Sequence, residues 1–166
     1  MVGRHDLEML HGGEKWGKVA AMQRPVLVGE YELTLDAKNR VAIPARLRAA
    51  FVEGIYLTKE PEPCLGGWNP DEFGDRLDED TAATAPGSAA RRDIKRTLAA
   101  NAVFLELDRQ GRVTLPLKHL KYAGVTHDVT VIGAQDHLEI WDRADWARYL
   151  ARLEEEADVT AAEHAT

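Results

Sequence analysis

Residues 35–44 read LDAKNRVAIP, and 72 positions later residues 107–116 read LDRQGRVTLP. Leucine, aspartate, arginine, valine and proline coincide in the two stretches, which share the pattern L-D-x-x-x-R-V-x-[IL]-P. The match extends past the proline pair, because Arg46 corresponds to Lys118. A period of this length is too long for a solenoid repeat and suits a duplicated small domain. The repeated piece is a charged turn, and the sequences of turns vary freely unless the turns have a function.

The length and composition are those of an ordinary soluble globular protein. The 166 residues suffice for one domain or two fused halves, and the hydrophobic content is 45%. A half of about 70 residues would be marginally stable alone, so the halves should share a core or rely on partners. No apolar run could span a membrane, and no signal-peptide pattern is present. Cys64 is the only cysteine, which excludes an intrachain disulfide and fits a reducing cytoplasm.

The charge is unevenly distributed along the chain. The net charge of −7 argues at first against a nucleic-acid partner. Residues 91–121, however, carry eight Lys and Arg against three acids, whereas residues 136–166 carry nine acids against three arginines. One basic face can attract phosphate while the whole chain stays acidic. A solvated surface with uneven charge explains the same numbers, so composition leaves both interpretations open.

Hydrophobic alternation and turn residues predict two similar halves of mixed structure. In each half a strand precedes the repeated turn and a return strand follows it, which predicts a hairpin with a four-residue loop. The proline then fits the first position of a short helix. Strands are expected at residues 26–35, 40–43, 55–58, 64–68, 102–107, 112–115, 129–132 and 138–141. Helices are expected at residues 45–52, 70–77, 89–100, 117–122 and after the capping residue Asp142.

These elements predict two repeats joined by a helix. The expected parts are a first repeat at residues 25–80, a linker and arginine-rich helix at 81–100, and a second repeat with a C-terminal helix at 101–157. Residues 1–24 lack a sustained period and are interpreted as a disordered extension. Within it, residues 1–21 are either an appended arm or an upstream over-extension of the coding sequence. Residues 158–166 are expected to form a frayed tail.

The repeated turn has the composition of a rigid loop that presents cations. Asn39 in the first copy and Gly111 in the second tolerate a left-handed backbone. The aspartate of each copy can accept N–H groups of its loop. Phosphate or base edges could then be read by the cations at the tip and exit of the loops, which are Lys38, Arg40, Arg109 and Arg112. Aspartate and arginine could equally form local ion pairs that only tie the turn, and physical arguments alone do not choose.

From about Val28 to Tyr149 the chain resembles the MraZ family, transcriptional regulators built from two AbrB-like (SpoVT/AbrB) repeats. The resemblance rests on GEYELTLDAKNRVAIP at residues 29–44, Cys64-Leu65, Arg91, Arg92, Arg96, LDRQGRV at 107–113, YAG at 122–124, VIG at 131–133, LEIWD at 138–142 and Trp146. Asn39 stands where the family motif usually has glycine, and the family generally lacks the 24-residue extension. These motifs are specific and span most of the chain.

The resemblance implies a fold, an assembly and a target. The fold would be mainly β with short helices (α+β), with two tandem AbrB-like swapped-hairpin β-barrel repeats that share a core. The assembly would be a ring-shaped homo-oligomer. The target would be double-stranded DNA with short direct repeats, in promoter regions of bacterial division and cell-wall genes.

The resemblance also assigns residues to roles. The cations at the DNA would be Lys38 and Arg40, with Arg109 and Arg112 as the matching copy. The turn-forming residues would be Asp36, Asn39, Asp108 and Gly111. Arg91, Arg92 and Arg96 lie on a predicted helix and would contact DNA or a neighbouring subunit, or simply face solvent.

No pattern in the sequence indicates catalysis. The six histidines are scattered, and Cys64 has no cysteine or histidine at zinc spacing. No phosphate-binding glycine loop or nucleophile elbow occurs. The sequence therefore predicts a DNA-binding regulator, not an enzyme, without cofactor, metal or membrane, in the cytoplasm and at the nucleoid. The alternative is a ring-forming scaffold or protein-interaction module that does not bind DNA.

Overall fold

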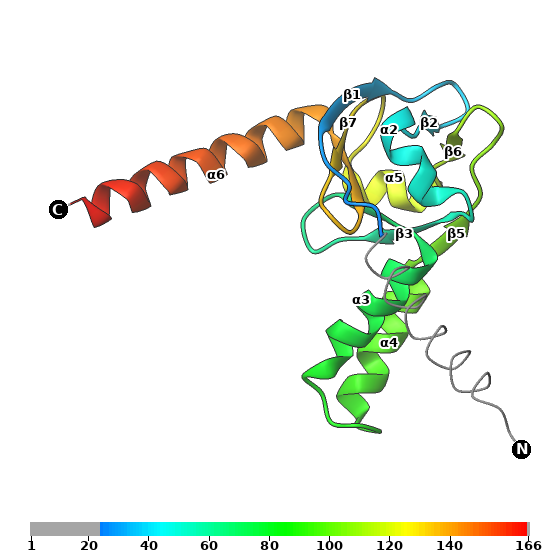
Figure 1. The fold of residues 1–166 in the computed structure, drawn as a ribbon, viewed down its shortest axis with the longest axis horizontal. Helices are drawn as coiled ribbons and strands as arrows, with labels where there is room; N and C mark the ends of the chain where they lie inside the picture. Colours follow the sequence, from blue (N-terminus) through cyan, green and yellow to red (C-terminus); the bar gives the residue numbers. More distant parts are fainter. Residues whose placement is uncertain (1–23, 166) are drawn as a thin grey trace, which may run out of the picture.

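The computed structural model describes residues 24–165, which form an α+β fold with two antiparallel sheets (Figure 1). The larger sheet has the strand order β1-β7-β8-β4-β3-β5, and the smaller one pairs β2 with β6. The strands are β1 (Glu30–Thr34), β2 (Arg40–Ala42), β3 (Ile55–Lys59), β4 (Leu65–Trp68), β5 (Val103–Leu105), β6 (Arg112–Thr114), β7 (Asp128–Gly133) and β8 (Leu138–Asp142). The helices are α2 (Ala45–Arg48) with the 3-10 turn η1 (Ala49–Phe51), α3 (Pro70–Ala82), α4 (Ala89–Asn101), α5 (Leu117–Ala123) and α6 (Arg143–His164).

The two halves of the chain are interleaved in both sheets. β1 of the first half pairs with β7 of the second, with Glu30 opposite Ile132. β3 of the first half likewise pairs with β5 of the second. β2 and β6, which follow the repeated turns, pair with each other around Val41 and Val113. Neither half contains a complete sheet, and the predicted α+β fold with a shared core is confirmed.

One part of the hairpin prediction is wrong. β1 and β2 belong to different sheets, and so do β5 and β6, so the strands on either side of each repeated turn do not pair as hairpin arms. Backbone hydrogen bonds close the loop itself, from the Asp36 N–H to the Arg40 carbonyl and from the Asn39 N–H to the Asp36 carbonyl, with counterparts in the second turn. Alternation of hydrophobic and polar residues predicts a strand and its buried face, whereas tertiary packing determines which strand it pairs with.

Side chains from both halves fill a common core beneath β2 and β6. Val41 and Ile43 from the first half and Val113 and Leu115 from the second are almost completely buried. Burial of each such side chain contributes about 1.5–3 kcal/mol. Because these residues directly follow the repeated turns, the exits of both turns are anchored in the core.

Capping residues explain where the helices begin. Asn69, Ser88 and Asp142 each accept the backbone N–H of the third residue that follows, at the starts of α3, α4 and α6. The cap predicted at Asp142 is therefore confirmed, and Asn69 and Ser88 act in the same way. Pro44 and Pro116 stand at the N-cap positions of α2 and α5, one residue before the predicted position.

Two segments differ from expectation. Residues 81–88, expected to be a linker, contain the end of α3 and the turn to α4, and the two helices form a hairpin that projects from the body (Figure 1). α6 continues to His164, so the fraying expected from residue 158 is not observed. The expected disordered extension, residues 1–24, lies outside the described residues except for Arg24.

Candidate nucleic-acid interface

Asp36 organises the first loop (residues 36–40). Its Oδ1 accepts the backbone N–H groups of Lys38 and Arg40, each at 2.9 Å, and its Oδ2 accepts Arg40 Nε at 2.7 Å. The Asn39 N–H donates to the Asp36 carbonyl at 3.0 Å, with Asn39 in the left-handed region at φ 58°. One carboxylate thus closes the backbone and orients the arginine.

The second loop (residues 108–112) repeats this arrangement bond for bond. Asp108 Oδ1 accepts the N–H groups of Gln110 and Arg112, each at 2.9 Å, and Oδ2 accepts Arg112 Nε at 2.8 Å. Gly111 takes the left-handed position at φ 74° and donates to the Asp108 carbonyl at 2.9 Å. The predicted turn-forming residues of both copies therefore lie where the sequence placed them.

Pairing of β2 with β6 brings the two loops side by side. The Leu115 N–H donates to the Asn39 carbonyl, and the Ile43 N–H donates to the Gly111 carbonyl, both at 2.9 Å. Arg112 Nη1 also lies 3.8 Å from Asp36 Oδ2, the carboxylate of the other loop. The result is one small surface that carries two arginines from sequence positions 72 residues apart.

Hydrogen bonding keeps both aspartates ionised. The backbone N–H of Arg40 is the main cause that lowers the pKa of Asp36, and the Arg40 side chain and the Lys38 N–H add to it. The Arg112 backbone N–H acts in the same way on the pKa of Asp108. A carboxylate that accepts several N–H bonds favours its charged form. Both loops therefore hold their arginines through charge-assisted hydrogen bonds at neutral pH.

The arginines keep one side available for a ligand. Arg40 and Arg112 use Nε for their own aspartates, and among residues 24–165 the Nη atoms of Arg40 have no partner. Their side chains are 27% and 28% exposed. The outer edge of a guanidinium held in this way can donate two parallel hydrogen bonds to a phosphate or to the major-groove edge of guanine.

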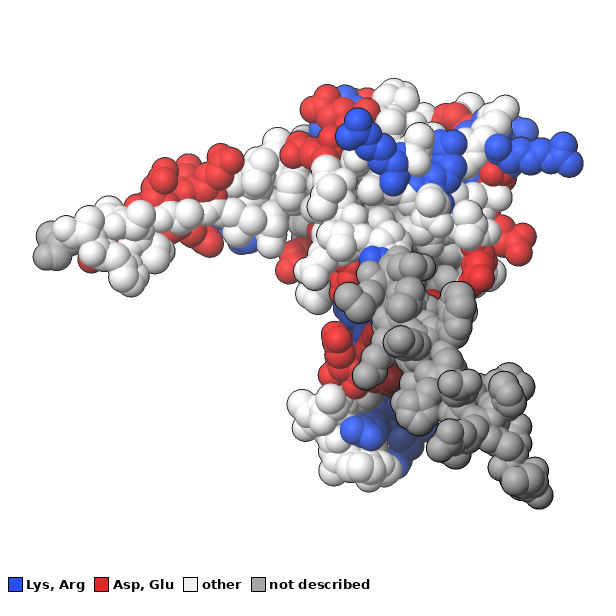
Figure 2. Space-filling model, viewed as in Figure 1, with Lys and Arg blue, Asp and Glu red and all other residues white. Residues whose placement is uncertain are grey.

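Lys38 and Arg109 are exposed at the loop tips, and neither forms a side-chain hydrogen bond or ion pair within the described part of the chain. They do not occupy equivalent positions, because Lys38 is the third residue of the first loop and Arg109 the second residue of the second loop. Figure 2 shows Lys and Arg atoms gathered on the part of the body where Figure 1 places the loops. The structure thus brings together the four cations singled out in the sequence.

Arg48 is a supporting residue that sequence reasoning missed. Its Nε and Nη2 donate to the Ile43 carbonyl at 3.3 and 2.9 Å. Its guanidinium also packs against Gly111 so closely that a Cβ at that position would overlap it. The available signal was a difference between the repeats, because the residue 72 positions after Arg48 is Leu120.

The three arginines of α4 are not part of this surface. Arg91 Nη2 donates to the carbonyls of Thr81 and Thr84, at the C-terminal end of α3. Arg92 donates to the Gly87 carbonyl at 2.6 Å, and Arg96 lies 3.4 Å from Asp93 on its own helix. Figure 1 places α4 on the projecting hairpin, away from β2 and β6. Arg91 thus stabilises the helical hairpin.

Other kinds of site find little support. Residues 24–165 contain no cluster of three or more His, Cys, Asp or Glu side chains that could hold a metal ion. Burial raises the pKa of the Cys64 thiol, which leaves it a protonated, packed side chain. Among the described helices, none is both long and apolar enough to cross a membrane.

The duplicated architecture has a counterpart in known proteins. The family described as "MraZ protein, putative antitoxin-like" matches the chain twice, at residues 26–96 and 98–166. The chain belongs to the MraZ family. Each MraZ match covers one half of the chain, in agreement with the two copies of the repeated loop.

Individual MraZ relatives agree over most of their length. A protein of Kocuria rhizophila named "Transcriptional regulator MraZ" is 38% identical over 129 residues, which cover 78% of this chain and 90% of that protein. Proteins of the same name from Corynebacterium efficiens and Roseiflexus castenholzii are 39% and 34% identical, over 83% and 82% of this chain and 94% of each relative. The MraZ chain therefore belongs to a family of transcriptional regulators and not of enzymes.

Proposed function

We propose that this chain regulates transcription by binding double-stranded DNA through the first and second loops. The observation that carries the proposal is the pair of matching Asp–Arg arrangements, side by side, in which each arginine is held through Nε and its side chain stays partly exposed. The names of the MraZ relatives support the same conclusion.

The loops are suited to DNA because their cations are held in place before binding. Arg40 and Arg112 are oriented by carboxylates, so little side-chain entropy is lost when they donate to a base edge or phosphate. Lys38 and Arg109 at the tips would contact phosphates and set the position of the loops on the duplex. The β2–β6 pair behind them is a two-stranded ribbon, a shape that the major groove admits.

The proposal includes assembly into a homo-oligomeric ring on short direct repeats. One pair of loops covers few base pairs and would bind weakly on an acidic protein with a net charge of −7. Several copies joined in a ring would raise the effective concentration of each further contact. Targets would lie upstream of bacterial division and cell-wall genes, as the resemblance implies, and the protein would act in the cytoplasm at the nucleoid.

Fluorescence anisotropy with DNA from the chain's own upstream region tests the proposal. The unchanged protein should bind this duplex more tightly than a shuffled one, and the double variant Arg40→Ala/Arg112→Ala should lose the difference. Lys95→Ala/Arg96→Ala is the matched control, since it removes two exposed positive charges on α4. The slope of affinity against salt counts the phosphates contacted. Equal binding by the double variant would reject the DNA interface and favour the scaffold alternative.

A further inference from the structure

α6 carries opposite charges at its two ends. Its first part, the α6 base (residues 143–152), contains three arginines and one acid, Asp145. Its second part, distal α6 (residues 153–164), contains five acids: Glu154, Glu155, Glu156, Asp158 and Glu163. Figure 2 shows these acidic atoms on the outer part of the helix. The proposed DNA interface makes no use of this separation.

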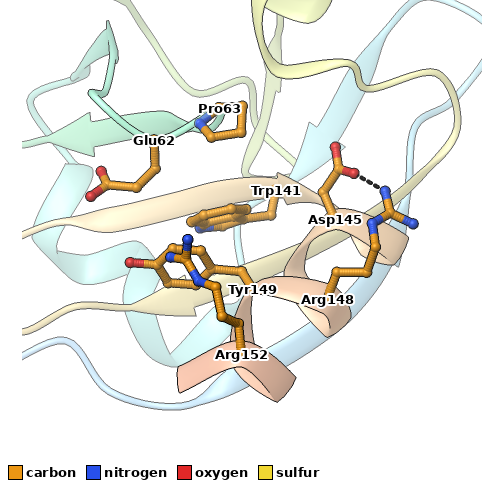
Figure 3. Close-up of a pocket in the computed structure, with 7 residues that line it drawn as sticks. All are labelled: Glu62, Pro63, Trp141, Asp145, Arg148, Tyr149 and Arg152. Atoms are coloured by element: carbon orange, nitrogen blue, oxygen red, sulfur yellow. Dashed lines mark hydrogen bonds and ion pairs between the residues drawn. The ribbon is translucent and has the colours of Figure 1, made fainter. Parts of the chain in front are cut away.

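A hollow of about 490 Å³ lies beside the α6 base (Figure 3). The rings of Trp141 and Tyr149 form its floor, with centroids 4.8 Å apart, and the Arg152 guanidinium lies 4.9 Å from the Tyr149 ring. Arg148 and Arg152 at its rim are 71% and 60% exposed. Glu62 and Asp145 also line the hollow, and Asp145 forms an ion pair with Arg148. The aromatic floor suits apolar side chains, and the exposed Arg148 and Arg152 can pair with further carboxylates at the rim.

Distal α6 has that chemistry, and its side chains are exposed within the described part of the chain. α6 packs on β7 and β8 near its start, and Figure 1 shows the rest of the helix running away from the body. Leu153 and Val159 are 39% and 59% exposed, and no residue of α6 is buried. Most helical stability in proteins comes from packing of an apolar face, so a surface that covered distal α6 would stabilise it.

We propose that distal α6 of one copy docks, antiparallel, over the hollow at the α6 base of a second copy. The reversed direction places Glu155 and Glu156 beside Arg148 and Arg152, and apolar side chains of distal α6 over the aromatic floor. Because a continuous helix cannot fold back onto its own base, the occupant must come from another molecule. Each α6 carries both surfaces, so the contact forms twice in a two-fold pair.

Charge favours a second copy over DNA as the occupant. The acids of distal α6 extend from the same helix and would repel phosphates that approached Arg148 and Arg152. The inference rests on the assembly part of the proposed function and adds a two-fold contact to it, which joins two copies and leaves closure of the ring to other surfaces. It does not involve the first and second loops, so the two proposals can fail separately.

A charge exchange tests the contact. One variant reverses the base, Arg148→Glu/Arg152→Glu, and the other reverses distal α6, Glu155→Lys/Glu156→Lys. Each alone should dissociate at concentrations at least tenfold higher than the unchanged chain in analytical ultracentrifugation. An equimolar mixture should recover assembly, because each variant then meets its complement. Circular dichroism checks that the helices persist, and a chain ending at Leu153 gives a second loss variant without charge reversal.

The mixture is the decisive measurement. The Arg152–Glu156 pair within one helix stays disrupted in both variants, so recovery on mixing can come only from contacts between copies. Unchanged assembly of the reversed variants, or a mixture no better than its components, would overturn the inference. So would a base-reversed variant that keeps its mass but binds a single-site duplex less tightly, since the arginines would then serve DNA. Binding of that duplex by every assembled sample would leave the loop proposal intact.

Discussion

The first and second loops have the same internal hydrogen bonds but different surroundings. Both close through an aspartate that accepts two backbone N–H groups and one arginine Nε, at distances that agree within 0.1 Å. Their surroundings diverge, because the second loop packs on Arg48 whereas the first has Leu120 at the corresponding sequence position. Their tip cations also occupy different positions. The duplication has therefore kept the part that orients arginine and changed the part that supports and surrounds it.

The largest expected effect is on DNA affinity, and it should differ between Arg40 and Arg112. Arg40→Ala should abolish specific DNA binding with the fold intact, because loss of a base or phosphate contact costs about 1–3 kcal/mol per copy and is multiplied over tandem sites. Arg112→Ala should weaken binding less, because Arg112 Nη1 already lies 3.8 Å from Asp36 Oδ2 of the first loop, whereas Arg40 is engaged through Nε alone among residues 24–165. Anisotropy titrations on a tandem-repeat duplex measure both. Unchanged binding by Arg40→Ala would show that the first loop is not the reader.

The next effect concerns stability. Gly111→Ala should lower the free energy of unfolding by about 1–3 kcal/mol, because a Cβ at φ 74° is strained and would displace the Arg48 guanidinium. Asn39→Ala is the matched change in the first loop, because it puts alanine at φ 58° without the Arg48 contact, and it should cost less, about 1 kcal/mol. Urea unfolding of the two variants measures the difference. Equal losses would mean that the surroundings of the loops matter less than their backbone.

A smaller effect is expected on the salt dependence of DNA affinity, to which the two tip cations should contribute separately. Lys38→Ala and Arg109→Ala each remove one exposed positive charge, and each should reduce the slope of log affinity against log salt by about 1. Their effect on sequence preference should be small, since phosphate contacts carry no base information. A titration between low and moderate salt measures the slopes. A slope that changes in only one variant would assign the phosphate contact to that loop alone.

The smallest expected effect is the pH dependence of the stability that the two loop aspartates contribute. Folding lowers the pKa of Asp36 and Asp108, so their stabilising contribution is complete above the unfolded pKa and is lost as the pH falls through the lower folded value. Asp36→Asn and Asp108→Asn should therefore melt below the unchanged protein at pH 7, and the gap should narrow on acidification. Melting curves from pH 7 to about pH 3 measure this trend. A gap that does not depend on pH would attribute the loss to geometry instead of charge.

The local chemistry of the loops could be predicted from sequence. An aspartate four residues before an arginine, with Asn39 or Gly111 between them, contains the acceptor, the partner and the left-handed residue that the loop needs. The caps at Asn69 and Asp142 were predictable for the same reason, since donor and acceptor are three residues apart. In each of these cases the interacting residues are only three or four positions apart in the sequence.

The arrangement between elements could not be predicted in this way. The pairing of β1 with β7 joins residues about one hundred positions apart, and nothing in Glu30–Thr34 specifies that partner. The contact of Arg48 with Gly111 depends on the position of α2 beside the second loop. The sequence underestimates the length of α6, because its last part is acidic and exposed, a composition that is typical of a frayed tail.

The interleaved sheets have a consequence for synthesis on the ribosome. β1 and β3 emerge long before their partners β7 and β5, and at about 5–20 residues per second β1 waits on the order of 5–20 s for β7. During that interval Val41, Ile43 and the other core residues of the first half have no second half to cover them. Apolar surface exposed in this way is prone to aggregation and is the kind of surface that chaperones protect. A chain that ends before β7 lacks the strand partners of β1 and β4.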